Sequence, residues 1–137
     1  MNRAELQQLA EDRILDAAAL LAAGRWSAAY YLAGYAVECA LKACIAKLTS
    51  QHDFPPKVKF VQDCYTHDLE KLLKAGGLKS DLDTDVAANV TLSGNWGVAK
   101  DWEEASRYEQ KTQAQAQTLY DAINGPDGIL PWIRLRW

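Results

Sequence analysis

The chain has 137 residues, a formal net charge of −3 and an isoelectric point near 5.3, with 49% hydrophobic and 24% charged residues. This length and composition predict a single globular domain over residues 1–137 and exclude general disorder. The acidic balance excludes a domain that holds DNA or other nucleic acid by bulk charge, so any contact with RNA requires a local patch.

The first predicted helix runs from Arg3 to Ala23, with leucine and alanine at helical spacing on its inward side. Gly24 ends it, because glycine is the residue best suited to a left-handed cap. Only Arg25 to Ser27 separate it from the next apolar run, with Ser27 or the residues just before it as the cap. So short a turn predicts that the two helices pack antiparallel.

The second predicted helix, Trp26 to Lys47, is apolar almost all the way round and is therefore expected at the centre of a bundle. Only Glu38 and Lys42 interrupt it with charge. They lie at i and i+4, so they share a face and either pair internally or project into a cleft. The uncharged run from Trp26 to Val37 has twelve residues, too few to cross a membrane.

Periodicity fails from Thr49 to Thr66, where Pro55 and Pro56 predict a long irregular connection. The next helix is expected to open at Thr66, whose hydroxyl can cap it. His67, Asp68 and Glu70 would then fill the first turn, and Gly76 with Gly77 would end it.

Three further helices are predicted downstream, at Asp83–Trp96, at Glu109–Asn124 and in a short segment from Pro131 to Trp137. No strand-like alternation is present. The predicted fold class is therefore all-α, an up-and-down bundle of five to six helices. The N-terminal sequence is polar, without the features of a signal peptide, and the three cysteines are expected to be reduced thiols in a cytoplasmic protein.

Two sequence motifs occur in a fixed order: Y-L-A-G-Y-A-V-E-C-A-L-K-A over residues 31–43 and T-H-D-L-x-x-L-L over residues 66–73. Together they resemble the HEPN family, nucleotide-binding domains shared by higher eukaryotes and prokaryotes. The resemblance continues more loosely through Asn95-Trp96, Asp101-Trp102, Ser106-Arg107-Tyr108 and residues 128–133.

This resemblance implies a helical bundle, a homodimer and, in bacteria, a minimal nucleotidyltransferase as the partner in a toxin–antitoxin pair. Many family members are similar to metal-independent ribonucleases whose motif is an arginine followed four to six residues later by histidine. The chain departs from that motif. His67 has no arginine at the required distance before it, and Arg107 has no histidine after it. The resemblance thus implies the fold, the dimer and a binding cleft, but not the ribonuclease activity.

His67 is the sharpest single candidate, because only histidine titrates near neutral pH without perturbation. In the first turn of a helix, a neutral ring would suit a general base or a hydrogen bond to a nucleotide. The alternative is that it caps the helix and packs against Tyr65.

Arg107 and Tyr108, near Trp96 and Trp102, predict a platform on which the guanidinium binds phosphate and the rings stack on bases. Alternatively, Glu103 or Glu104 holds Arg107 at helical spacing and the tryptophans belong to the core. The basic and aromatic tail from Trp132 to Trp137 is expected to present a solvated outer face, with Trp137 buried.

No metal site or cofactor is expected, because His52 and His67 lie fifteen residues apart and no ligand spacing is present. The leading hypothesis is a HEPN-like dimer, weakly active or inactive, that binds a nucleotide, RNA or a nucleotidyltransferase. Its cleft would be lined by Glu38, Lys42, His67 and Arg107, with Asp68, Trp102 and Tyr108 contributing to binding. The second hypothesis is a ribonuclease with His67 as general base and Arg107 or Lys42 stabilising the phosphorane. The third is an interaction module whose alanine faces bury a partner helix.

Overall fold

The computed structural model describes residues 1–49 and 57–137, which contain helices and no strand. This confirms the all-α prediction. In chain order the elements are α1 (Arg3–Ala22), α2 (Trp26–Thr49), α3 (Val58–Cys64), α4 (Leu69–Ala75), α5 (Lys79–Ala88), α6 (Val90–Ala99), the 3-10 helix η1 (Glu104–Tyr108), α7 (Gln113–Asn124) and α8 (Ile129–Arg134). In the same described part of the chain, no helix is both long and apolar enough to span a membrane.

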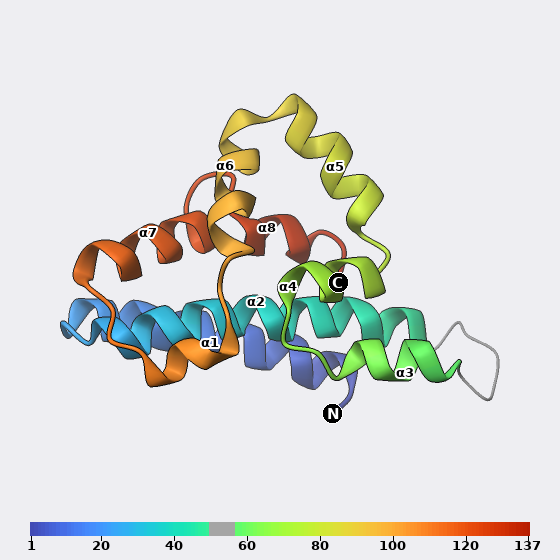
Figure 1. Cartoon of the computed structure of the whole chain (residues 1–137), viewed down its shortest axis with the longest axis horizontal. Helices are drawn as coiled ribbons and strands as arrows, with labels where there is room; N and C mark the ends of the chain where they lie inside the picture. Colours follow the sequence, from blue (N-terminus) through green and yellow to red (C-terminus); the bar gives the residue numbers. More distant parts are fainter. Residues whose placement is uncertain (50–56) are drawn as a thin grey trace.

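Helix α2 lies at the centre of the fold and contacts α1, α4, η1, α7 and α8. Figure 1 shows α1 running beside it along most of its length, while α7 and α8 cover another side and α5 and α6 lie farthest out. Gly24 takes a left-handed φ of 72° in the turn that reverses the chain. The predicted antiparallel pair and the predicted central helix are therefore confirmed.

The close approach of Trp102 to α2 depends on Gly34. The indole of Trp102 lies against this glycine so tightly that an added Cβ would be 2.2 Å from two of its ring atoms. Trp102 is only 1% exposed and also packs against Tyr31, with ring centroids 5.9 Å apart. A residue with any side chain at position 34 would push the indole away and move the segment that leads into η1.

Two predictions for residues 49–68 are wrong in the part of this segment that the structure describes. Residues 58–64 form α3, although the sequence predicted an irregular segment there. None of these residues is fully buried, so the sequence of α3 shows no apolar repeat at helical spacing. Residues 50–56, including His52 and both prolines, lie outside the described part of the chain. Helix α4 begins at Leu69, and Asp68 rather than Thr66 caps it by accepting a hydrogen bond from the Lys71 N–H.

The predicted helix at residues 83–96 is in fact two helices. Asn89 lies between α5 and α6 with extended angles (φ −138°, ψ 101°), and its side chain caps α6 by accepting from Leu92 N–H. Similarly, α7 starts at Gln113, where Thr112 and Gln115 form a capping box, and α8 starts at Ile129. Because breaks and caps divide the chain further, the predicted number of five to six helices is too low.

Residues 132–137 contact parts of the chain that are distant from them in sequence. Arg134 binds Glu11 of α1 through two hydrogen bonds of 2.7 and 2.8 Å. Asp85 of α5 accepts from Trp132 Nε1 at 2.8 Å and from Arg136 at 2.9 Å. Trp132 is buried and Trp137 only half-buried, so the prediction of a buried Trp137 is wrong.

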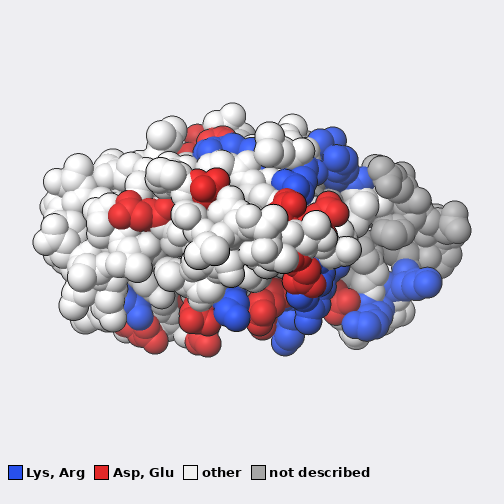
Figure 2. All heavy atoms as spheres, turned by 90° about the horizontal axis from the view of Figure 1, so that it is seen from above, with Lys and Arg blue, Asp and Glu red and all other residues white. Residues whose placement is uncertain are grey.

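Charges of both signs are mixed on the face seen from above, and no region of this face is uniformly basic (Figure 2). Its left part, where α7 lies, carries few charges. This distribution agrees with the expectation that phosphate contacts require a local site rather than the field of the whole molecule.

Candidate functional site

Glu38 and Lys42 form the ion pair that their spacing on α2 predicts. Lys42 Nζ donates to Glu38 Oε1 at 2.9 Å. Glu38 is only 2% exposed, and its second oxygen, Oε2, has no hydrogen-bond partner among the described residues. A buried carboxylate is costly unless cations or hydrogen-bond donors compensate it, so Glu38 depends on the groups around Oε1.

His67 lies between two carboxylates. Its Nδ1 is 2.8 Å from Glu38 Oε1, and its Nε2 is 3.1 Å from Glu104 Oε2. A neutral imidazole has one N–H and can donate to only one of them, whereas a ring protonated on both nitrogens donates to both. His67 precedes α4 rather than occupying its first turn, so the predicted capping role is wrong.

Glu104 links this arrangement to Arg107. Its Oε1 is 3.1 Å from Arg107, at the i, i+3 spacing that was one of the predicted alternatives. The result is a continuous chain of polar contacts, in the order Lys42, Glu38, His67, Glu104 and Arg107. It connects α2 to η1 through the turn before α4, and it fixes the position of η1.

The helix η1 separates two cavities of opposite character. The acidic cavity, of about 640 Å³, is lined by His67, Asp68, Glu70, Lys100, Asp101, Trp102, Glu103, Glu104 and Ala105. The cationic cavity, of about 580 Å³, is lined by Gly24, Arg25, Trp26, Ser27, Ala28, Tyr31, Arg107, Tyr108, Glu109, Gln110 and Lys111. The predicted binding residues are thus divided, with Asp68 and Trp102 on one side and Arg107 and Tyr108 on the other.

The acidic cavity is unsuited to phosphate, because its lining contains five carboxylates and only two basic side chains, Lys100 and His67. Trp102 forms part of its wall, yet its ring is almost completely buried. It supports Tyr31 and η1 from below and offers no face to a stacking base. In residues 1–49 and 57–137, no three His, Cys, Asp or Glu side chains lie where they could hold a metal ion together.

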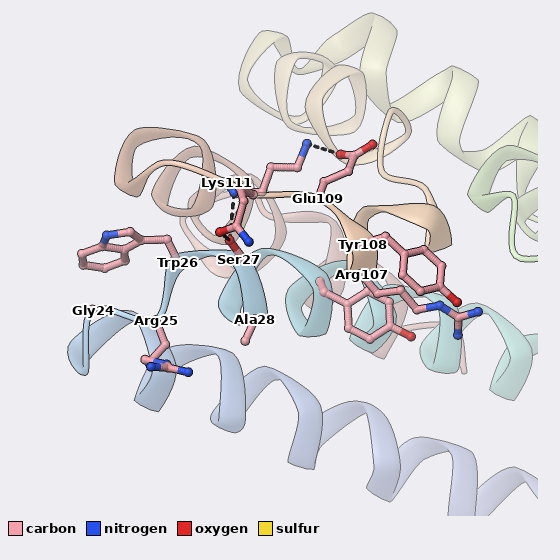
Figure 3. Close-up of a pocket in the computed structure, with 11 residues that line it drawn as sticks. Gly24, Arg25, Trp26, Ser27, Ala28, Arg107, Tyr108, Glu109 and Lys111 are labelled. Carbon is pink, nitrogen blue, oxygen red and sulfur yellow. Dashed lines mark hydrogen bonds and ion pairs between the residues drawn. The ribbon is translucent and has the colours of Figure 1, made fainter.

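The cationic cavity forms where the start of α2 meets the segment 107–111 (Figure 3). Ser27 accepts a hydrogen bond from the Lys111 backbone N–H at 2.9 Å, and its hydroxyl donates to Gln110 at 3.4 Å. These bonds hold together segments that are more than 80 residues apart. The first turn of α2 contains no acidic residue, so its dipole also favours an anion here.

Each cation of this cavity has a different environment. Lys111 pairs with Glu109 at 2.7 Å, and this hydrogen bond raises the pKa of Lys111 above its ordinary value. The Arg107 guanidinium carbon lies 4.8 Å from the centroid of the Tyr108 ring. Arg25 is exposed and has no acidic partner within the described residues. It is therefore a cation free to bind a ligand.

The sequence reasoning missed Arg25, Trp26 and Lys111 as site residues and treated the first two as a turn. The available signal was a basic residue and an aromatic residue at the start of a long helix whose first turn has no acid. Pairing them with Lys111 required a contact between segments far apart in the sequence.

Comparisons with protein-family models, with curated proteins and with solved structures find no match to this chain.

Proposed function

We propose that the chain is a HEPN-like helical domain that binds a nucleotide or single-stranded RNA in the cationic cavity. One observation carries the proposal. Three cationic side chains (Arg25, Arg107, Lys111) and three aromatic side chains (Trp26, Tyr31, Tyr108) line the same cavity of about 580 Å³.

This combination matches the two parts of a nucleotide. Guanidinium groups bind phosphate oxygens through paired hydrogen bonds, and a protonated lysine adds a point charge. Aromatic rings offer faces on which bases stack, an interaction worth about 1–3 kcal/mol per base. Tyr108 is 79% exposed, so its ring is available to a ligand without rearrangement of the core.

The residues of the family resemblance build the support for this cavity. The motif over residues 31–43 supplies Gly34, on which Trp102 packs, and Glu38, which binds His67. His67 in turn holds Glu104 and therefore η1, which carries Arg107 and Tyr108 to the cavity. In this proposal His67 positions the binding segment and does not contact the ligand.

A homodimer and a minimal nucleotidyltransferase are the partners that the resemblance adds to the proposal. For such a partner we propose a surface away from the cationic cavity. Leu135, 83% exposed, borders a mostly apolar cavity of about 400 Å³ between the α5–α6 region and α8.

Binding is favoured over ribonuclease activity by the surroundings of His67. A general base needs a ring nitrogen that is free to accept a proton from the substrate. Here both nitrogens face carboxylates, and His67 lies in the acidic cavity, on the other side of η1 from Arg25 and Lys111.

The proposal is tested by titrating the protein with a short fluorescently labelled RNA and with nucleoside monophosphates. The double variant Arg25→Ala/Arg107→Ala is expected to lose most of the affinity. Lys74→Ala, which removes an exposed cation outside every cavity described here, is the matched control and should bind normally. The proposal is overturned if none of these ligands binds, or if the double variant binds them as tightly as the unmodified protein.

A further inference from the structure

The cationic cavity has a cation and an aromatic ring at each of two separated ends. Figure 3 shows Arg25 and Trp26 at one end, Arg107 and Tyr108 at the other, and Lys111 with Glu109 above the stretch between them. From this arrangement we infer that the site holds two consecutive nucleotides of single-stranded RNA, one at each end. The inference rests on the proposed function and specifies its ligand.

The first end is built on the turn between α1 and α2. The indole of Trp26 lies over Gly24, where an added Cβ would be 3.6 Å from the ring. Trp26 is half-buried, which holds the ring in place, and the adjacent Arg25 is exposed and unpaired within the described residues. A base can stack on the indole while its phosphate reaches the guanidinium.

The second end is built on η1. Arg107 lies over one face of the Tyr108 ring at 4.8 Å and is held from behind by Glu104 at 3.1 Å. The exposed ring and the adjacent guanidinium repeat the chemistry of the first end. Figure 3 shows the two pairs at opposite ends of the cavity, so we assign one nucleotide to each end.

The stretch between the ends is fixed by the hydrogen bonds from Ser27 to the 110–111 segment. The lining side chains carry three positive charges and one negative charge, from Glu109, which leaves a formal charge of +2. Each linking phosphate within an RNA chain carries one negative charge, so two of them would neutralise it.

The inference is tested by comparing three ligands in calorimetric titrations: uridine monophosphate, 5′-phosphorylated diuridylate and 5′-phosphorylated tetrauridylate. The dinucleotide is expected to bind about tenfold or more tightly than the mononucleotide, because a second base is stacked. The tetranucleotide should bind about as well as the dinucleotide. The slope of log K against log salt concentration should be about −1.4 for both, since each phosphate neutralised on a single strand contributes about −0.7.

Variants separate the two ends. Arg25→Ala should reduce the slope for the dinucleotide to about −0.7 and bring its affinity close to that of the mononucleotide. The mononucleotide should still bind at Arg107 and Tyr108. Arg107→Ala should have the converse effect, with the mononucleotide still bound at Arg25 and Trp26, and unchanged melting temperatures would show that both variants fold.

The outcomes distinguish this inference from the proposed function. If mononucleotide and dinucleotide bind equally well and Arg107→Ala weakens both, the proposed function stands and the two-nucleotide site is wrong. If affinity and salt slope continue to rise from two to four nucleotides, the site is longer than inferred and the inference is also overturned. If no ligand binds, both proposals fail.

Discussion

Replacing Gly34 with alanine tests the packing on which the site rests. The added Cβ would lie 2.2 Å from Trp102 Cδ1 and Nε1 and 2.3 Å from Cδ2, far inside contact distance. The indole is 1% exposed, so it has no free space into which to move. Overpacking of this kind costs about 1–3 kcal/mol, and complete displacement of the ring costs up to about 5 kcal/mol.

The helix itself gains stability from the same change. Alanine is favoured over glycine in a helix by about 0.5–1 kcal/mol, which offsets part of the cost. The expected net loss in the free energy of unfolding is therefore about 1–4 kcal/mol. Urea denaturation followed by circular dichroism measures it directly, provided that unfolding remains two-state.

Gly94→Ala is the matched control. Gly94 also lies inside a helix, α6, but no atom is within 4 Å of an added Cβ, so only the propensity gain of about 0.5–1 kcal/mol should appear. The two substitutions are thus expected to change stability in opposite directions. If Gly34→Ala is as stabilising as Gly94→Ala, Trp102 does not pack on α2 as described.

Three more predictions follow from the contacts described above. Glu104→Gln should weaken the contacts of Glu104 with His67 and Arg107, loosen η1 and lower RNA affinity up to about fivefold at low salt, measured by titration; an unchanged or higher affinity would contradict this. Burial raises the pKa of Cys39 and of Cys44 to about 11, so at pH 8 only about 0.1% of each is thiolate and a thiol-reactive dye should label the native protein slowly. Rapid labelling of both before denaturant is added would refute that burial. Asn89→Ala should lower the free energy of unfolding by about 0.5–2 kcal/mol in urea denaturation, because α6 loses its cap, and an unchanged value would argue against the observed break.

Helix α2 was predictable because apolar residues repeat at helical spacing over its whole length and only Gly34 inside it disfavours a helix. The divided helix at Asn89 was not, since Val86, Ala87 and Val90 continue the apolar pattern across the break. Helix α3 was missed for the opposite reason: none of its residues is fully buried, and only Phe60 and Cys64 pack partly against the core, so its sequence shows no clear apolar stripe.

The contacts of the site also differ in how far the sequence could predict them. The pair of Glu38 and Lys42 is local to one helix, so its spacing alone predicted it. The position of His67 beside Glu38 followed from two motifs expected to share a crevice. The separation of the acidic and cationic cavities depends on where η1 crosses α2. Tertiary packing sets the position of that crossing, so it could not be predicted from the local sequence.

The attachments made by residues 132–137 have a consequence for synthesis. Arg134 reaches Glu11 across 123 positions of sequence, and Arg136 reaches Asp85 across 51. Translation produces α1 and α5 long before it produces the arginines that bind them. These two contacts can therefore form only after the tail has left the ribosome, whereas α1 can pack along α2 before then.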